Sequence, residues 1–297
     1  MGSVRIAALA AVAAVAITSG AAVAADYPCQ PSYPNAPVPP HCMTPPPPPP
    51  PPPVIEEFGG WYIRGDIGMT NQSVGSLDNA LFATATGLRV VDMNFESGML
   101  FGLGVGYKWN SWLRFDVTGE YRGETGFHGM DVYTDVVAPT NRFNNYTAKK
   151  SEWLYLANVY ADLGTWGGVT PFVGAGIGIA RIGIHSFRDA GIGAGSVPAL
   201  AYADSDYKWN VAYALHAGLA YEVTKNFTIE LAYRYVYLGT GQSGDIIAYD
   251  GTNSIRNPMI FNDIDSHDLK LGIRYLFASA PQQYQMQQVF QPLMRRF

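Results

Sequence analysis

The residues of this chain that could do chemistry are charged side chains placed at alternate positions of otherwise apolar runs. In "GWYIRGDIGM" (60–69), Arg64 and Asp66 fall on one side of an extended strand, and Trp61, Ile63 and Ile67 fall on the other. Buried opposite charges persist only when they are paired and hydrogen-bonded. The alternation predicts an inward-facing, near-neutral network of paired charges: Arg64, Asp66, Lys108, Arg114, Asp116, Glu120, Arg122, Glu152, Asp162, Lys208, Glu222, Glu230, Arg234, Asp268, Lys270 and Arg274.

Histidines are the next candidates, because a histidine beside a nucleophile would indicate catalysis. His185 and Ser186 are adjacent, so on a strand they would point to opposite faces. His216 is predicted to lie in the interior beside Glu222, as a member of the network. No nucleophile, base and orienting group can be assembled from the spacing, which predicts a protein that is not an enzyme and has no cofactor. The histidines considered are His41, His128, His185, His216 and His267.

An acidic segment, 244–268, raises the question of calcium, which prefers oxygen ligands. Its spacing matches no calcium-loop pattern, and a solvated acidic surface is the favoured interpretation. No metal site is therefore predicted. The acids concerned are Asp245, Asp250, Asp263, Asp265 and Asp268.

Eight alternating runs must position these side chains. The connections "NS", "GTWGG" and "TKN" are short, whereas 71–96, 123–151, 183–206 and 239–265 are long. Tight turns at one end and long loops at the other predict an all-β, antiparallel up-and-down barrel, and the even strand number suits a closed transmembrane barrel. The runs lie near 60–70, 97–109, 112–122, 152–163, 169–182, 207–223, 227–238 and 266–277.

The volumes of the two faces predict which one lies inside. Bulky residues such as Leu103 and Leu231 alternate with small ones such as Gly104 and Ala214. The interior of an eight-stranded barrel is barely wide enough for side chains, so the small and charged face belongs inside. An exterior so apolar would aggregate in water but suits lipid. A water-filled pore usually needs about sixteen strands, so the interior is predicted to be plugged by ion pairs.

Aromatic residues support a membrane setting, because they gather at two levels. Trp109 and Trp166 fall at the short-turn end of the runs, and Trp153 and Trp209 fall near the long loops. Two aromatic belts with aliphatic residues between them match the two interfaces of a bilayer.

The N-terminus predicts export. Arg5 precedes the apolar "IAALAAVAAVAI" and a stretch of small residues, which is typical of a secretory signal peptide over 1–24. The mature chain would begin Ala25-Asp26; cleavage after Ala25 is the alternative. The net charge of −5 provides no basic stripe, so nucleic acid is an unexpected partner.

Residues 25–58 are predicted to be a periplasmic linker, and residues 59–277 the barrel. "TPPPPPPPPP" adopts polyproline II, because each ring fixes φ and leaves no amide to donate. An oxidising compartment permits a disulfide between Cys29 and Cys42; two unpaired thiols are the alternative. The glutamine-rich tail 278–297 is predicted to be disordered.

Four segments carry a resemblance to a known family: "GGWYIRGDIGM", "TPFVGAGIGIA", "LAYRYVYLG" and "HDLKLGIRYLF". They resemble the small outer-membrane β-barrel proteins of alphaproteobacteria, which belong with the OmpA/OmpX-like and opacity-protein barrels. The resemblance implies an outer-membrane location with periplasmic termini and contact with membrane lipid and lipopolysaccharide. It further implies a terminal strand, ending in Phe277, that is read by the barrel assembly machinery.

The same resemblance implies a surface antigen or structural envelope protein that presents four extracellular loops. Adhesion to a host surface or haem binding through those loops is implied by some relatives, as is attachment of Ala25 to peptidoglycan. The alternatives are a porin-like channel for small solutes or ions and, third, a barrel enzyme that modifies lipid A.

Overall fold

The computed structural model describes residues 59–134, 141–192 and 198–277. The predicted signal peptide, linker and C-terminal tail lie outside the described residues, and so do Ala25, Cys29 and Cys42. What the sequence predicts for them stays a prediction.

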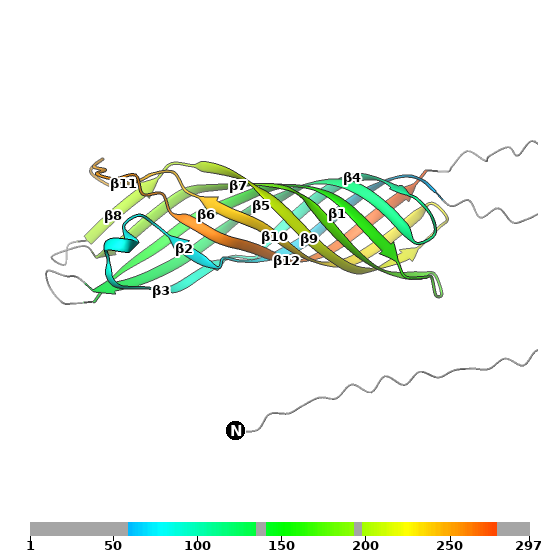
Figure 1. Cartoon of the computed structure of the whole chain (residues 1–297), viewed down its shortest axis with the longest axis horizontal. Coiled ribbons are helices and arrows are strands. Elements are labelled where there is room, and N and C mark those ends of the chain that lie inside the picture. Colours follow the sequence, from blue (N-terminus) through cyan, green and yellow to red (C-terminus); the bar gives the residue numbers. More distant parts are fainter. Residues whose placement is uncertain (1–58, 135–140, 193–197, 278–297) are drawn as a thin grey trace, which may run out of the picture. The chain divides into compact units, whose positions relative to one another are not determined.

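Eight long strands form a closed antiparallel ring, which confirms the predicted barrel (Figure 1). Each strand pairs with the next one around the ring, and the last pairs back with the first. In ring order the strands are β1 (Gly60–Ser73), β4 (Gly98–Lys108), β5 (Leu113–Thr134), β6 (Asn141–Asp162), β7 (Val169–Ile192), β9 (Asp206–Glu222), β10 (Phe227–Gln242) and β12 (Ile260–Leu276).

The predicted long loops are largely strand, which corrects the sequence analysis. β5 and β6 have 22 residues each and β7 has 24, although about 9–11 suffice to cross a membrane. Added strands continue the wall: β3 pairs with β5, β8 with β7, β11 with β8 and β2 with β12. The added elements are β2 (Ser76–Asp78), the 3₁₀ turn η2 (Phe82–Thr84), β3 (Thr86–Phe95), β8 (Pro198–Ala203) and β11 (Ile246–Ala248).

These elements gather at one end of the barrel, opposite the end where β1 begins and β12 ends (Figure 1). We call this region the distal extension and define it by residues 74–95, 124–134, 141–150, 184–192, 198–206 and 243–259.

Short polar turns close the other end. Asn110 accepts hydrogen bonds through Oδ1 from the amides of Trp112 (3.0 Å) and Leu113 (2.7 Å), which reverses the chain between β4 and β5. Thr224 Oγ1 accepts from the amide of Phe227 (3.0 Å) between β9 and β10. Side chains that satisfy turn amides thus set the register of the paired strands.

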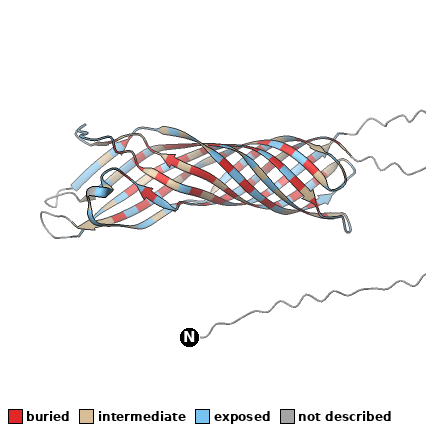
Figure 2. Cartoon of the chain, viewed as in Figure 1, coloured by how far each residue is buried: buried red, intermediate tan, exposed pale blue. Residues whose placement is uncertain are grey.

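Buried and exposed residues alternate along the strands, as Figure 2 shows. Small residues face inward where a large side chain lies across the interior. A Cβ at Gly106 would clash with the Tyr62 ring and the Phe115 carbonyl, and a Cβ at Gly272 would clash with the Asp66 carboxylate. These close approaches explain the glycine-rich inner face.

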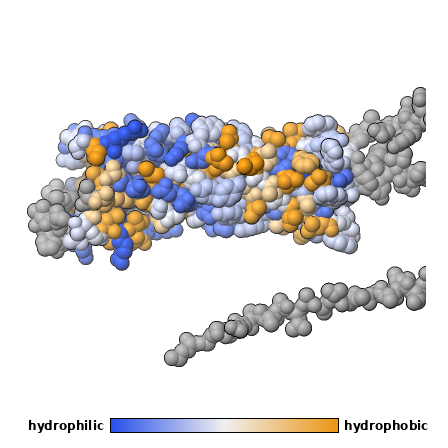
Figure 3. All heavy atoms as spheres, in the orientation of Figure 1, coloured by the Kyte–Doolittle hydropathy of each residue, from blue (hydrophilic) through white to orange (hydrophobic). Residues whose placement is uncertain are grey.

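The outer surface of the wall is apolar over the predicted membrane span. Aliphatic side chains such as Leu103, Leu231 and Leu271 are exposed between exposed aromatic residues toward both ends. On the face seen in Figure 3, hydrophobic side chains lie in patches toward both ends, and at the distal end strongly hydrophilic side chains lie beside them. Within the described residues, no helix has the length and apolar character needed to span a membrane.

Candidate functional site: the barrel interior and its distal cavity

The interior near the short turns holds a cluster of ion pairs, which we call the proximal cluster. Arg64 contacts Asp66 at 2.8 Å and Asp116 at 3.0 Å, and Arg114 contacts Asp162 at 3.0 Å. Glu230 joins the cluster through ion pairs with three guanidinium groups: Arg64 (3.3 Å), Arg114 (3.3 Å) and Arg274 (3.0 Å).

A second cluster, the distal cluster, lies further along the interior. Arg122 reaches Asp268 and Glu152 at 2.9 Å each, and Arg234 contacts both Asp268 and Glu120 at 2.6 Å.

Lys270 connects the two clusters, since its Nζ lies 3.4 Å from Asp66 and 3.5 Å from Glu120. Basic and acidic side chains are equal in number across both clusters, so the buried charge is compensated. The members are Arg64, Asp66, Arg114, Asp116, Glu120, Arg122, Lys150, Glu152, Asp162, Glu230, Arg234, Asp268, Lys270 and Arg274.

Three residues of the predicted network lie elsewhere. Glu222 is exposed at the short-turn end of β9, so its prediction as an interior member is wrong. Lys108 and Lys208 are half-buried, and no ion pair joins either of them to another described residue. Alternation identifies the face on which a residue lies, but a residue near the open end of a barrel still meets water.

Lys150 is a network member that the sequence analysis missed. Its buried ammonium contacts Glu152 Oε1 at 2.5 Å and lies 4.2 Å from the centroid of the Phe95 ring. The sequence predicts a loop over 123–151, which includes residue 150. The signal that could have found it is the spacing in "KSE", which puts Lys150 and Glu152 on one face of a strand.

His216 is buried in the interior, as predicted, but not beside Glu222. It lies opposite Arg234 of β10, its Nε2 is 3.2 Å from Asn158 Oδ1, and its ring is 5.2 Å from that of Tyr160. His216 therefore packs within a polar network in the proximal half of the barrel. The residues it contacts there include no serine or cysteine nucleophile.

An apolar plug fills the interior beyond the distal cluster. Phe127 is at its centre, with ring centroids 4.9 Å from Phe261 and 5.0 Å from Phe95. Strands from around the ring contribute, so the plug extends across the interior. Its members are Phe95, Phe127, Leu154, Ile182, Ile184, Phe187, Val236, Leu238, Met259, Phe261 and Ile264.

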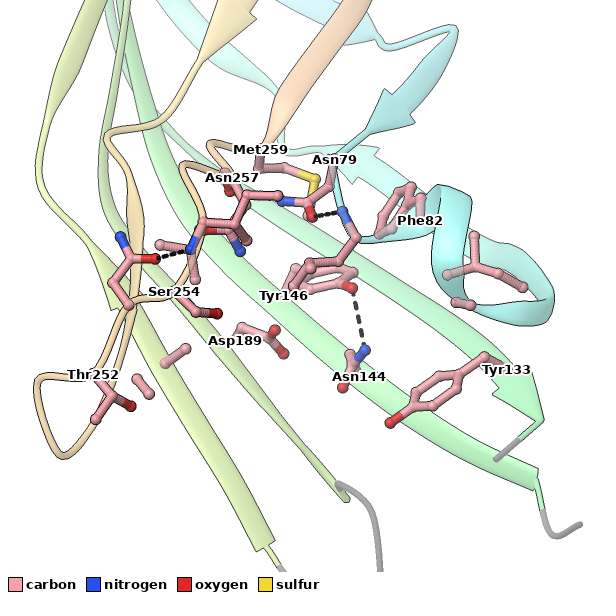
Figure 4. Close-up of a pocket in the computed structure, with 18 of the residues that line it drawn as sticks. Asn79, Phe82, Tyr133, Asn144, Tyr146, Asp189, Thr252, Ser254, Asn257 and Met259 are labelled. Atoms are coloured by element: carbon pink, nitrogen blue, oxygen red, sulfur yellow. Dashed lines mark hydrogen bonds between the residues drawn. The ribbon is translucent and has the colours of Figure 1, made fainter. Parts of the chain in front are cut away.

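Above the plug, the distal extension lines a cavity of about 560 Å³ (Figure 4). The inner faces of β5, β6 and β7 form one wall, and residues 79–88 and 246–259 form the other. Asn79 ties the two covering segments together, because its Nδ2 donates to the Asn257 carbonyl at 2.7 Å. A cavity of this size falls in the range of sites for small molecules.

The acids of 244–268 do not assemble into a metal site. Asp268 belongs to the distal cluster, while Asp245 accepts hydrogen bonds from Asn253 (2.6 Å) and from the amide of Asn257 (2.7 Å). Across the described ranges, no group of three or more His, Cys, Asp or Glu side chains is placed to hold a metal ion.

A closed antiparallel barrel with an apolar outer wall and a charged, filled interior defines a class, the outer-membrane β-barrel proteins. Residues 51–277 match the family model described as "Outer membrane protein beta-barrel domain". The chain belongs to this family, and it resides in the outer membrane of a Gram-negative cell with its long strand connections outside.

Individual proteins are similar to this chain. An uncharacterized protein of Brucella suis is 30% identical over 73% of this chain and 85% of its own length. A Rickettsia rickettsii protein named as a candidate adhesin is 27% identical over 72% of this chain and 87% of its own length. Among solved structures, Neisserial surface protein A aligns with 18% identity and a TM-score of 0.40, over 74% of this chain and 100% of its own.

Proposed function

We propose that this protein is a non-conducting, non-enzymatic anchor in the outer membrane whose distal extension is a contact surface outside the cell. The observation that carries the proposal is the filled interior. Two ion-paired clusters and the apolar plug occupy successive levels of the barrel, so a hydrated ion would have to break buried pairs and then cross a dry layer.

The distal extension supports the second half of the proposal. Phe143 of β6 is ten residues beyond Trp153, which corresponds to roughly 30 Å of strand and lies beyond the membrane. Phe143, Leu200, Tyr202 and Tyr249 are nevertheless exposed there. Exposed apolar groups that lipid does not cover are typical of protein–protein contact sites. The name of the Rickettsia rickettsii relative agrees with this interpretation.

The channel alternative makes an opposite prediction about conductance. We expect the purified full-length protein to give no discrete current steps in planar bilayers, because ion pairs and the apolar plug occupy the interior. Insertion is verified in parallel by heat-dependent electrophoretic mobility. Steps whose amplitude scales with KCl concentration would overturn the anchor and favour a porin-like channel.

The contact surface can be tested by shortening one hairpin. Replacing residues 127–148 with a two-residue turn removes the distal part of the β5–β6 hairpin and leaves the membrane-spanning pairs below it. We expect cells that display the full-length protein to bind cultured host cells. Cells that display equal amounts of the shortened protein should lose at least about half of that binding, because Phe143 is removed and the distal part of β7, which carries β8 with Leu200 and Tyr202, loses its pairing with β6. Unchanged binding would contradict the proposal.

Further roles rest on the ends of the barrel. The Phe277 amide donates to the Trp61 carbonyl at 2.9 Å, so Phe277 completes the last strand and is the residue we propose for recognition by the assembly machinery. Attachment of Ala25 to peptidoglycan and support of envelope integrity are proposed from the family resemblance alone. Lipid A of altered mass in producing cells would instead favour the enzyme alternative.

A further inference from the structure

A pair of carboxylates at the distal cavity is not explained by the anchor function. Asp131 of β5 is fully buried and accepts hydrogen bonds from the Tyr146 hydroxyl and from Asn144 Nδ2 (3.1 Å). Asp189 of β7 pairs in register with Tyr146, and its carboxyl group points into the cavity (Figure 4). Asp189 Oδ1 is buried and has no hydrogen-bond partner among the described residues.

The surroundings of Asp189 make its charge costly. Burial raises the pKa of Asp189 to about 7, and the negative charge of Asp131 adds to the shift. Tyr146 of β6 and Tyr133 of β5 are the other titratable side chains that line the cavity. Arg142, buried on β6, makes contacts of its own. A buried acceptor with a missing partner is a common feature of ligand sites, because the ligand supplies the missing donor.

The rest of the cavity is suited to an apolar group. Phe82 and Leu88 line it from one covering segment, and Ile246 and Met259 line it from the other. Asn144 and Tyr146 lie beside Asp189 on the opposite wall. The cavity thus combines one acidic end with an apolar body, which is the usual composition of a small-molecule site.

We propose that the distal cavity binds a small amphipathic organic cation, with its ammonium group at Asp189 and its apolar body against Phe82, Leu88 and Met259. An ammonium group carries donors and no acceptor, so it would satisfy Asp189 Oδ1 and offset the repulsion between Asp189 and Asp131. A neutral or anionic ligand would leave that repulsion in place. The site goes beyond the anchor function, since neither adhesion nor a sealed barrel requires it.

The proposal can be tested with 2-phenylethylammonium as the probe and 2-phenylethanol as its neutral match. Binding to the full-length protein in lipid nanodiscs is measured by calorimetry at pH 8. We expect the cation to bind, and Asp189→Asn to weaken its affinity on the order of tenfold or more, as for loss of a charge-assisted hydrogen bond. The alcohol should bind to the wild-type protein more weakly than the cation does, and its affinity should be the same for the wild type and for Asp189→Asn. Asp204→Asn, at an exposed acid of the distal extension that does not line the cavity, is the matched control and should change nothing.

The pH dependence provides an independent measurement. Because the raised pKa keeps Asp189 protonated below about pH 7, cation binding should strengthen as pH rises from 5.5 to 8, and Asp189→Asn should abolish that dependence. Preserved electrophoretic mobility of the folded variant excludes misfolding. Equal affinity of wild type and Asp189→Asn, equal affinity for alcohol and cation, or no binding of the cation at millimolar concentration would each overturn the proposal.

Discussion

Arg122→Met is expected to destabilise the barrel by about 3–5 kcal/mol, because it leaves buried carboxylates without their cationic partner. Arg122 reaches Asp268 and Glu152 at 2.9 Å and Glu120 at 3.3 Å, and its guanidinium is almost completely buried. Methionine matches the length of the stem but offers no donors. The free energy of unfolding is measured by urea titration of the protein folded into lipid vesicles.

Lys149→Met is the matched control, since Lys149 contacts Glu124 at 2.5 Å with both side chains exposed. An exposed pair contributes less than about 1 kcal/mol, so the control should unfold close to wild type. Adding Asp268→Asn to Arg122→Met removes one of the buried charges left without a partner. The double variant should therefore lose less unfolding free energy than the sum of the losses of the two single variants. If Arg122→Met costs no more than Lys149→Met, the interior is hydrated and the plugged-barrel interpretation fails.

The membrane-spanning wall could be predicted from the sequence because each of its faces meets one kind of environment. Arg64 and Asp66 alternate with Ile63 and Ile67. Because lipid requires apolar side chains on the outer face, polar inward residues and apolar outward residues alternate in the sequence. The volume difference between Leu103 and Gly104 then settles which face lies inside. Strand number and order follow from the turns.

The distal extension could not be predicted in the same way, because water bathes its outer face. Lys149 points outward and Lys150 inward, so the two environments no longer produce an alternation of polarity. Asp131 and Asp189 were hidden in predicted loops for this reason. Their proximity arises from pairing between β5, β6 and β7, which brings together residues almost sixty positions apart and leaves no local pattern.

Glu222 illustrates a different limit, which concerns depth along the barrel axis. It lies on the inward face by alternation and opposite Thr228, yet it is exposed at the open end. The apolar plug was missed for a related reason: Phe127 and Phe261 look like the lipid-facing aromatics of other strands. A period of two reports the face of a residue but not its level.

Leu271→Arg is expected to cost about 2–4 kcal/mol of unfolding free energy, as for a guanidinium placed at the middle of a bilayer. Leu271 is 48% exposed on the outer wall and lies between Ile67 of β1 and Leu231 of β10. Tyr275 marks the short-turn belt on the same strand, and His267, packed on Tyr235, marks the distal level. The measurement is urea unfolding in lipid vesicles.

Two further variants separate lipid from water as the cause. Leu271→Ala removes the leucine side chain without adding charge, and Val223→Arg places the same charge on an exposed residue in the short turn between β9 and β10. If lipid bathes the wall, Leu271→Arg loses clearly more than either control. A barrel bathed in water would accept an arginine at a half-exposed leucine with a change of about 0.5 kcal/mol. Equal stability of Leu271→Arg and Leu271→Ala would therefore place this wall in water, and the exposed aliphatic band would need a protein partner to cover it.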